Sequence, residues 1–564
     1  MMPSLQDAMA AMVAQSEVVV YLATTIVTMD PMRPTAEAIA VADGRIVAVG
    51  THAEVVAALG SRPFRVDEAF AAKVLVPGFI DQHVHPELAG MTMSLPIISM
   101  EDWVLPTGTV PAVRDRAGYR RRLAEAIASD SGTGTFFTWG FHHYFHGTLT
   151  RADLDAIEMR RPVVVWHRSA HEFILNTAAL EHFAITPEFF AGLPDSVREQ
   201  ASYDDGHFWE QSWFAVLPKV LPEIAEPRRL TAGLVFVQHY LHAAGITVAC
   251  EPGGIASRAL QDAQNAVLGD RSTPVRFYYI PDGKTMAALH LDGDLIAETE
   301  KLLDWGAGMT SFLPRQVKLF ADGAIFSQTM QMRDGYLDGH VGEWIIDPAV
   351  FLKAFRAYWD AGYQIHIHQN GDAGLDLILD CLEANMERNP RTDHRTTVVH
   401  FGFSTVEQVE RIARLGAIVS ANPYYLTALA DRYSEDGIGH DRSDAIVRLA
   451  DVRHAGVSLS LHSDMPMAPA QPLFLMWCAV NRTTFSGRVA RPDLRISSED
   501  ALRAVTIDAA YSIRLEREVG SLEPGKRANV TVLEENPLTV APALLKDIAI
   551  WGTILEGRVQ PLGS

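Results

Sequence analysis

The sequence predicts an α/β fold: a (β/α)8 TIM-like barrel, a β-sandwich domain built from both chain termini, and insertions over the barrel mouth. Two observations lead to this prediction. The middle of the 564-residue chain alternates short apolar runs with stretches long enough for helices. Both ends of the chain are rich in β-forming residues. Eight βα units in succession are typical of a barrel of parallel strands.

β-rich segments open and close the chain. Residues 18–29 and 38–49 favour strands, and Asp43-Gly44 within the second run is typical of a hairpin turn. Similar runs follow near the end of the chain, at residues 528–533, 548–554 and 557–559. We therefore expect the two ends to form one β-sandwich, from residues 1–76 and 516–564. The alternative is two unrelated edge ribbons.

Eight apolar runs are the candidate barrel strands. In chain order they are residues 76–85, 163–167, 246–250, 316–322, 363–368, 396–400, 417–421 and 457–464. We assign residues 77–515 to the barrel domain. The intervals before the second and third strands, about 80 residues each, exceed what a βα unit needs. We expect insertions there, at about residues 86–160 and 181–240, because long loops at a barrel mouth commonly carry function.

Composition excludes several classes of protein. The formal charge of −21 argues against a nucleic-acid binder, since phosphate backbones are also negative. No uncharged apolar run approaches the roughly 20 residues that span a bilayer, so we expect no membrane association. Residues 1–16 lack the pattern of a secretory signal. The three cysteines are widely spaced, which favours a reducing compartment and a cytoplasmic location.

The strongest chemical signal is the segment Pro77-Gly-Phe-Ile-Asp-Gln-His-Val-His85. Alternate residues of a strand share a face, so His83 and His85 project side by side. Active sites of barrels form at the C-terminal ends of the strands. Two neighbouring imidazoles there suit a shared metal ion. An HxH pair alone is a weak signal, and its position at the end of an apolar strand strengthens it.

Further candidate strands carry metal-binding or acid–base residues at or near their ends: Lys318, His366, His368, His400, His462 and Asp464. Each has an ordinary structural alternative. A strand-end histidine can be hydrogen-bonded in the core, Asp464 can cap a helix, and Lys318 can extend to water. Each of these structural alternatives explains one residue only, and none explains why all of them lie at strand ends. Their coincidence at the first, fourth, fifth, sixth and eighth strands favours one shared site.

Several motifs together resemble the amidohydrolase superfamily of metal-dependent hydrolases, and within it the YtcJ-like branch that includes N-substituted formamide deformylase. The similarity runs over nearly the whole chain. The matching segments are residues 43–50, 77–85, 148–155, 161–165, 171, 176–180, 244–248, 317–323 and 520–529. One departure lies after His368, where the chain reads Gln369-Asn370 and many relatives have other residues before the Gly-Asp pair.

The resemblance implies a site for two divalent metal ions, expected to be zinc. His83, His85 and Asp464 would hold one ion. His368 and His400 would hold the second, and Lys318 would bridge them as a carbamate formed from its amine and CO2. A neutral amine can react with CO2, and two cations would stabilise the resulting anion.

The implied reaction is hydrolysis of a carbon–nitrogen bond other than a peptide bond. The metals would lower the pKa of water to give a bridging hydroxide, and Asp464 would act as general base and then as acid toward the leaving nitrogen. His171 would bind the carbonyl or oxyanion, with a core histidine as the alternative. Residues expected to support the ligands from behind are His366, His462 and Asp322.

The substrate pocket is less well determined by the sequence. Aromatic residues in expected insert or loop positions are candidates for an apolar lining: Phe208, Trp209, Trp213, Tyr424 and Tyr425. The alternative is ordinary core. We expect a neutral, partly hydrophobic amide, N-acyl or N-formyl compound, on family analogy. His142, His143 and His146 lie among aromatic residues, which favours an aromatic lid over a third metal site.

Other functions remain open at this stage. The same site would suit a lactonase or esterase, a deaminase or a decarboxylase. Deaminases of this superfamily generally use one metal and no bridging lysine, so the metal count separates them. A catalytically silent barrel scaffold is the alternative from a different class, and retention of all six ligand positions argues against it. The resemblance also implies a homodimer that acts on a small molecule.

Overall fold

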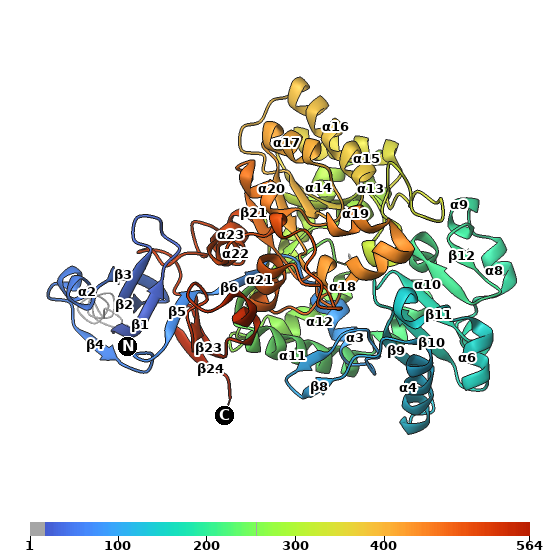
Figure 1. The fold of residues 1–564 in the computed structure, drawn as a ribbon, viewed down its shortest axis with the longest axis horizontal. Coiled ribbons are helices and arrows are strands. Elements are labelled where there is room, and N and C mark those ends of the chain that lie inside the picture. The colour runs from blue at the N-terminus through green and yellow to red at the C-terminus, as the bar shows by residue number, and fades with distance from the viewer. Residues whose placement is uncertain (1–16, 255–256, 564) are drawn as a thin grey trace, which may run out of the picture.

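The computed structural model describes residues 17–254 and 257–563. Figure 1 shows both chain ends on one side of the molecule, the later strands and helices at its centre, and residues from about 100 to 220 on the opposite side. Residues 1–16, on which the expected absence of a secretory signal was based, lie outside the described residues. No helix of the described chain is long and apolar enough to cross a membrane.

The two chain ends form one sheet. Its strand order is β24-β23-β22-β5-β1-β2-β3, and β4 also pairs with β1. The bounds are β1 (Val18–Val27), β2 (Thr35–Ala42), β3 (Arg45–Gly50), β4 (Phe64–Asp67), β5 (Val74–Pro77), β22 (Val530–Leu533), β23 (Ile550–Leu555) and β24 (Arg558–Pro561). Asp43 and Gly44 turn with positive φ between β2 and β3, which confirms the predicted hairpin. Helix α2 (His52–Leu59) covers this sheet.

Eight parallel strands surround the centre. They are β6 (Phe79–Asp81), β14 (Ile246–Pro252), β15 (Arg276–Ile280), β17 (Gln316–Phe320), β18 (Gln364–Gln369), β19 (Thr397–His400), β20 (Ile418–Ala421) and β21 (Leu459–Leu461). The first three pair in order, as do the last five, and β16 (Thr310–Phe312) also pairs with β15. Parallel bridges join the two groups, Asp282 with Lys318 and Val84 with Met465. Strand pairing thus returns to its start, and we call these eight strands the strand ring.

One predicted barrel strand is wrong. Residues 163–167 form β10 (Val163–His167), which pairs with β9 and β11 in a separate sheet. The missing ring strand is β15, residues 276–280. The run Val-Val-Val-Trp-His is buried throughout, and such a run fits any fully buried strand, so it does not reveal which sheet it joins. β15 reads Arg-Phe-Tyr-Tyr-Ile with Phe277 and Tyr279 buried, a strand signal that the sequence prediction overlooked.

The insertion is consequently longer than the two predicted segments, because it fills the whole interval between β6 and β14. Its sheet has the order β12-β13-β11-β10-β9. The strands of this sheet are β9 (Phe136–Phe141), β10, β11 (Glu172–Leu175), β12 (Ala201–Ser202) and β13 (His207–Trp209). In the same insertion, β7 (Trp103–Leu105) and β8 (Gly108–Val110) pair with each other. Its helices are α3 (Pro86–Thr92), α4 (Arg116–Ser129), α5 (His143–His146), α6 (Arg151–Ile157), α7 (Thr177–His182), α8 (Pro187–Ala191), α9 (Asp195–Arg198), α10 (Glu210–Ile224) and α11 (Pro227–Ala243).

Helices follow the ring strands: α12 (Arg258–Leu268), α13 (Gly283–His290), α14 (Leu295–Glu300), α15 (Pro348–Asp360), α16 (Asp372–Arg388), α17 (Val406–Leu415), α18 (Tyr424–Arg432), α19 (His440–Asp444), α20 (Leu449–His454), α21 (Pro472–Asn481), α22 (Ser498–Ala504) and α23 (Ile507–Ser512). α17 shows how local sequence fixes its bounds. Thr405 and Gln408 form a capping box at its start, and Gly416 ends it with a φ of 71°. Val409 and Ile412 face the core.

Helix α3 begins directly after His85 and packs against α11. The two helices approach most closely at Gly90 and Gly233. A Cβ atom on Gly233 would lie 1.9 Å from the backbone oxygen of Gly90. Only a residue without a side chain permits this separation.

We predict that Gly233→Ala destabilises the protein by about 1–3 kcal/mol, because the added methyl forces the two helices apart. At an unhindered helix position the same change would be stabilising. Chemical denaturation followed by circular dichroism measures the effect. Val235→Ala is the control, since Val235 lies on the same helix and is 39% exposed. An unchanged or higher stability of Gly233→Ala would contradict the packing described.

Candidate metal centre

Backbone hydrogen bonds join the end of the first ring strand to the end of the last. The Asp464 N–H donates to the His83 oxygen at 2.9 Å, and the His85 N–H donates to the Met465 oxygen at 2.9 Å. Asp464 adopts a φ of 60°, a left-handed conformation that is uncommon for residues other than glycine. The two segments together bring His83, His85 and Asp464 to one place, as the sequence predicts.

These three residues have the geometry of a cation site. Asp464 Oδ1 lies 3.3 Å from His83 Nε2 and 3.1 Å from His85 Nε2. The three ligand atoms lie within 4.8 Å of one another. His83 Nε2 and Asp464 Oδ1 are buried, and neither makes a hydrogen bond with the described residues. Buried polar atoms normally have hydrogen-bond partners. A nitrogen and an oxygen that lack such partners and lie close together are suitable ligand atoms for a divalent metal ion.

Glu251 orients His85. It is the last residue but one of β14, and its Oε1 lies 2.5 Å from His85 Nδ1. This contact leaves His85 Nε2 toward Asp464, because a carboxylate fixes which imidazole nitrogen carries the proton. Burial lowers the pKa of His85, but Glu251 and Asp464 outweigh it and raise that pKa to about 10. The carboxylates of Glu251 and Asp464 therefore favour a positive charge at His85.

The remaining predicted ligands lie beside this group. The imidazole rings of His83 and His400 have centroids 4.8 Å apart, and those of His368 and His400 are 4.4 Å apart. His368 Nε2 is 2.9 Å from Asn370 Nδ2. The pKa values of His368 and His400 are lowered, by burial first, so both rings are neutral as ligands must be.

Lys318 lies inside the strand ring and is only 1% exposed. Burial lowers the pKa of its amine to about 7. Gly253 makes room for the side chain, since a Cβ there would lie 2.7 Å from Lys318 Cγ. A neutral amine is thus accessible near neutral pH, which is the state that reacts with CO2. This fits the chemistry expected of Lys318.

Residues behind the ligands hold them in place. His462 Nε2 lies 3.2 Å from His400 Nδ1, and His462 Nδ1 lies 2.9 Å from Ser420 Oγ. His462 can also join His83 and His400 around one cation. His366 contacts Gln316 instead, with its Nε2 2.9 Å from Gln316 Oε1. It does not border the cavity beside the metal centre.

Asp322 organises the loop after β18. Its carboxylate accepts backbone N–H bonds from Asn370 at 3.0 Å, Gly371 at 2.6 Å and Gln331 at 3.0 Å. Burial raises its pKa to about 7. Asp322 therefore positions Asn370, which contacts His368, and it does not itself reach the cavity.

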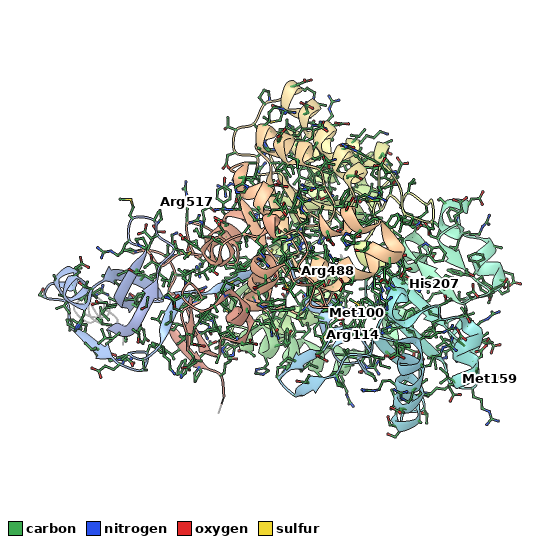
Figure 2. All side chains as sticks on the ribbon, in the orientation of Figure 1. Met100, Arg114, Met159, His207, Arg488 and Arg517 are labelled. Atoms are coloured by element: carbon green, nitrogen blue, oxygen red, sulfur yellow. The ribbon has the colours of Figure 1, made fainter. Side chains whose placement is uncertain are left out.

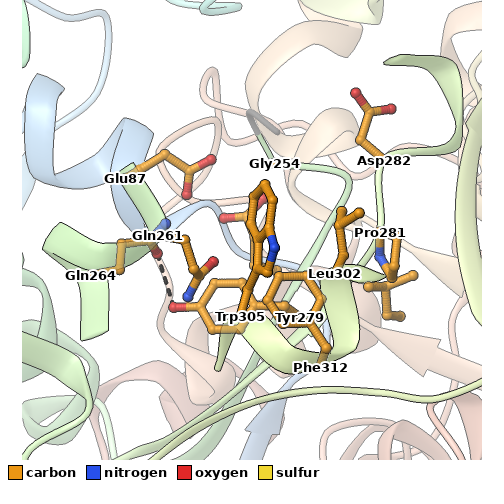
Figure 3. Close-up of a pocket in the computed structure, with 12 residues that line it drawn as sticks. Glu87, Gly254, Gln261, Gln264, Tyr279, Pro281, Asp282, Leu302, Trp305 and Phe312 are labelled. Atoms are coloured by element: carbon orange, nitrogen blue, oxygen red, sulfur yellow. Dashed lines mark hydrogen bonds between the residues drawn. The ribbon is translucent and has the colours of Figure 1, made fainter. Parts of the chain in front are cut away.

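A cavity of about 330 Å³ opens over these residues. Most of its wall is apolar and aromatic, and Lys284 adds a cation whose Nζ lies 3.3 Å from the centre of the Phe214 ring. His83, His85, Lys318, His368, His400 and Asp464 all border it. A smaller cavity of about 20 Å³ adjoins it, and both cavities are bordered by Glu87, Gly254 and Asp282 (Figure 3).

Two of the five aromatic residues predicted to line the pocket do so. Trp213 and Tyr425 border the cavity, whereas Trp209 and Tyr424 do not. Tyr424 and Tyr425 are neighbours on α18, where successive side chains point about 100° apart. Only Tyr425 therefore faces the cavity. Trp209 instead donates from Nε1 to Glu343 Oε1 at 3.2 Å. Phe208 is fully buried in the core of the insertion.

His171 borders the cavity, as predicted. Its Nδ1 lies 2.9 Å from Glu210 Oε2, and its ring stacks on Trp213 with centroids 5.9 Å apart. Glu210 also accepts a hydrogen bond from Thr329 Oγ1 at 2.8 Å. This leaves His171 Nε2 as the nitrogen available to a bound molecule.

Sequence reasoning missed Glu251, Asn370 and Ser420. Glu251 carried a usable signal, because it stands at the end of a predicted strand in the sequence Cys-Glu-Pro. The rule that selected the histidines would have selected it too. Ser420 lies inside a short apolar strand, and nothing in the sequence distinguishes it from core.

Comparison with known families now decides the assignment. The profile described as "Amidohydrolase family" matches residues 72–560. The chain belongs to the amidohydrolase family.

Relatives within that family place this amidohydrolase in the YtcJ-like branch. It is 27% identical to N-substituted formamide deformylase of Arthrobacter pascens, over 95% of this chain and 97% of the relative. It is 24% identical to putative amidohydrolase YtcJ of Bacillus subtilis (strain 168), over 93% of this chain and 95% of the relative. The predicted resemblance is confirmed.

Solved structures support the same fold. An uncharacterised metal-dependent hydrolase from Pyrococcus horikoshii OT3 superposes with a TM-score of 0.70 at 19% identity, covering 93% of this chain and 99% of that one. A second, from Pyrococcus furiosus, gives a TM-score of 0.68 at 20% identity, covering 93% and 100%. At these identities the likeness shows a shared fold.

We predict that Glu251→Gln weakens metal binding to this amidohydrolase by about 10- to 100-fold, because the His85 ring loses the carboxylate that orients it. Competition with a chelator measures the affinity. The control is Glu223→Gln, which alters a comparable glutamate–histidine contact, 2.5 Å from His182 Nε2, at the surface of the insertion. Equal affinities for wild type and Glu251→Gln would show that Glu251 does not orient a ligand.

Proposed function

We propose that this protein is a metal-dependent hydrolase that cleaves the carbon–nitrogen bond of a small amide, N-acyl or N-formyl compound. The observation that carries the proposal is the convergence on one cavity of six residues that lie on or just after five ring strands: His83, His85, Lys318, His368, His400 and Asp464. Family membership and the 27% identity to a formamide deformylase support the reaction type.

We infer that the strand ring is the (β/α)8 barrel of this family and that the sheet from the chain ends is its β-sandwich. The change from one sheet to the other falls between β5 and β6, next to the expected boundary at residue 77. The domain limits at residues 76 and 516, a homodimer and a cytoplasmic location stay predictions from the sequence.

The residues present fit two divalent ions, which we expect to be zinc. His83, His85 and Asp464 would hold one, and His368 with His400 the other, with carboxylated Lys318 shared between them. When bound, such ions lower the pKa of water and polarise a carbonyl group. His/carboxylate donor sets accept Zn, Mn, Fe or Co, so metal availability also matters.

The chain's own residues supply the proton transfers. Asp464 would accept a proton from the attacking water and deliver it to the leaving nitrogen, as a general base and then a general acid. With its Nδ1–H donated to Glu210, His171 would need a second proton, on Nε2, to donate to the substrate oxygen. The apolar walls would exclude bulk water and strengthen both interactions.

The cavity limits the substrate class. Trp213, Phe214, Phe320 and Phe326 provide aromatic surface near the ligands. Pockets of this kind bind the apolar part of a ligand and use a few polar groups to orient it. A formyl or small acyl group at the metal centre with a hydrophobic substituent on nitrogen fits this arrangement.

We predict that Asp464→Asn lowers kcat on such substrates by at least about 100-fold, because the amide cannot shuttle the proton. Release of the free amine from a panel of N-formyl and N-acyl amines measures turnover, and elemental analysis of the same sample gives the metal content. Asp493→Asn is the control, since Asp493 pairs with Arg491 at the surface. Unchanged turnover by Asp464→Asn would refute its role as the base.

We also predict that metal-free protein regains activity only when bicarbonate accompanies the metal. Lys318 must be neutral to react with CO2, and its pKa is lowered to about 7 by burial. The neutral fraction rises as the pH passes upward through the pKa, so reactivation should be faster at pH 8 than at pH 6 when the concentration of dissolved CO2 is held equal at the two pH values. Reactivation independent of bicarbonate would contradict the carbamate.

A further inference from the structure

A second cluster of metal-binding side chains lies in the insertion, outside the cavity. Glu172 begins β11, and its Oε2 lies 2.9 Å from His143 Nε2 and 2.7 Å from His207 Nε2. The three ligand atoms lie within 4.8 Å of one another. Figure 2 shows His207 on the insertion, away from the sheet of the chain ends. None of these side chains borders the catalytic cavity.

Glu172 is buried without a full set of partners. Its side chain is 3% exposed, and its Oε1 accepts no hydrogen bond. Its ion-pair contacts among the described residues are all with histidines; neither lysine nor arginine lies within 4.0 Å. Burying a carboxylate without a compensating cation is costly. A cation at this point would remove that cost.

His167 lies beside Glu172 and is also incompletely hydrogen-bonded. Its Nδ1 lies 3.2 Å from Glu172 Oε1 and accepts a hydrogen bond from the Ser169 N–H at 3.1 Å. Because His167 Nδ1 accepts the hydrogen bond from Ser169, it carries a lone pair and no proton. It therefore cannot donate to Glu172 Oε1, and the two acceptor atoms lie close together. His167 Nε2 is buried and has no partner among the described residues. Hydrogen bonds within the cluster therefore leave it incompletely satisfied.

We propose that His143, Glu172 and His207 bind a divalent transition-metal ion such as Zn²⁺, distinct from the catalytic metals. Two imidazoles and a carboxylate with an open position are a common zinc ligand set. Tetrahedral Zn²⁺ places neighbouring ligand atoms roughly 3.3 Å apart, so the atoms need to separate by about half an ångström. The side chains of His143 and His207 are 26% and 20% exposed, which gives them freedom to move and gives the ion a path of entry.

The site would fix the hairpin between β10 and β11. Glu172 follows His171 directly in the chain, and His167 precedes the same turn. A metal that immobilises Glu172 would hold His171 against the catalytic cavity. This consequence depends on the proposed function of His171, whereas the existence of the metal site does not.

The experiment is a metal count combined with crystallography. Wild type and the variant His143→Ala/His207→Ala are loaded with zinc, freed of excess ion, and analysed by elemental mass spectrometry. We expect the variant to hold one equivalent less than wild type and to keep the catalytic zinc. Wild-type crystals grown with zinc should show an anomalous peak at the zinc edge between His143, Glu172 and His207.

His182→Ala is the matched control, since it removes a histidine–glutamate contact in the same insertion without a third ligand. It should bind as much zinc as wild type. Equal zinc contents of the double variant and wild type would overturn the proposal. So would the absence of an anomalous peak at the cluster in crystals of wild type, a result that does not depend on any variant folding. Loss of the catalytic zinc alone, in His83→Ala, should leave this peak in place.

Discussion

The closure of the strand ring at Asp464 is the constraint on which the rest of the site depends. The last ring strand must lie against the first for Asp464 to face His83 and His85, and two backbone hydrogen bonds hold that seam. Asp464 accepts a left-handed backbone conformation to reach this position, at a cost of order 1–3 kcal/mol. The side chain that gains from this geometry is the one proposed to bind metal and move the proton.

The convergence of the candidate ligands was predictable from the sequence, because alternate residues of a strand point to the same face. His83 and His85 share a face whatever the rest of the fold does, and residues at the ends of parallel strands meet at one edge. The same logic located Lys318, His368, His400 and Asp464. The hairpin at Asp43-Gly44 was also predictable, since its turn chemistry is local.

The errors arose where position depends on tertiary pairing. Residues 163–167 have the composition of a buried strand and form one, but the sheet that they join is decided by β9 and β11. Tyr424 and Tyr425 were both assigned to the pocket, although one helix cannot turn two adjacent side chains the same way. Glu251 stands at the end of a predicted strand, which is a usable signal, but its contact with His85 joins segments far apart in the sequence.

The order in which these contacts can form has a consequence for synthesis of the chain. Strand β6 leaves the ribosome early, and its partner β21 emerges only after most of the chain. Contacts between distant segments form late and slowly. During much of synthesis, His83 and His85 are therefore present without Asp464. In the same way, β5 has to remain unpaired on one side until β22 has been synthesised. The proposed metal site is therefore complete only after the last ring strand has formed.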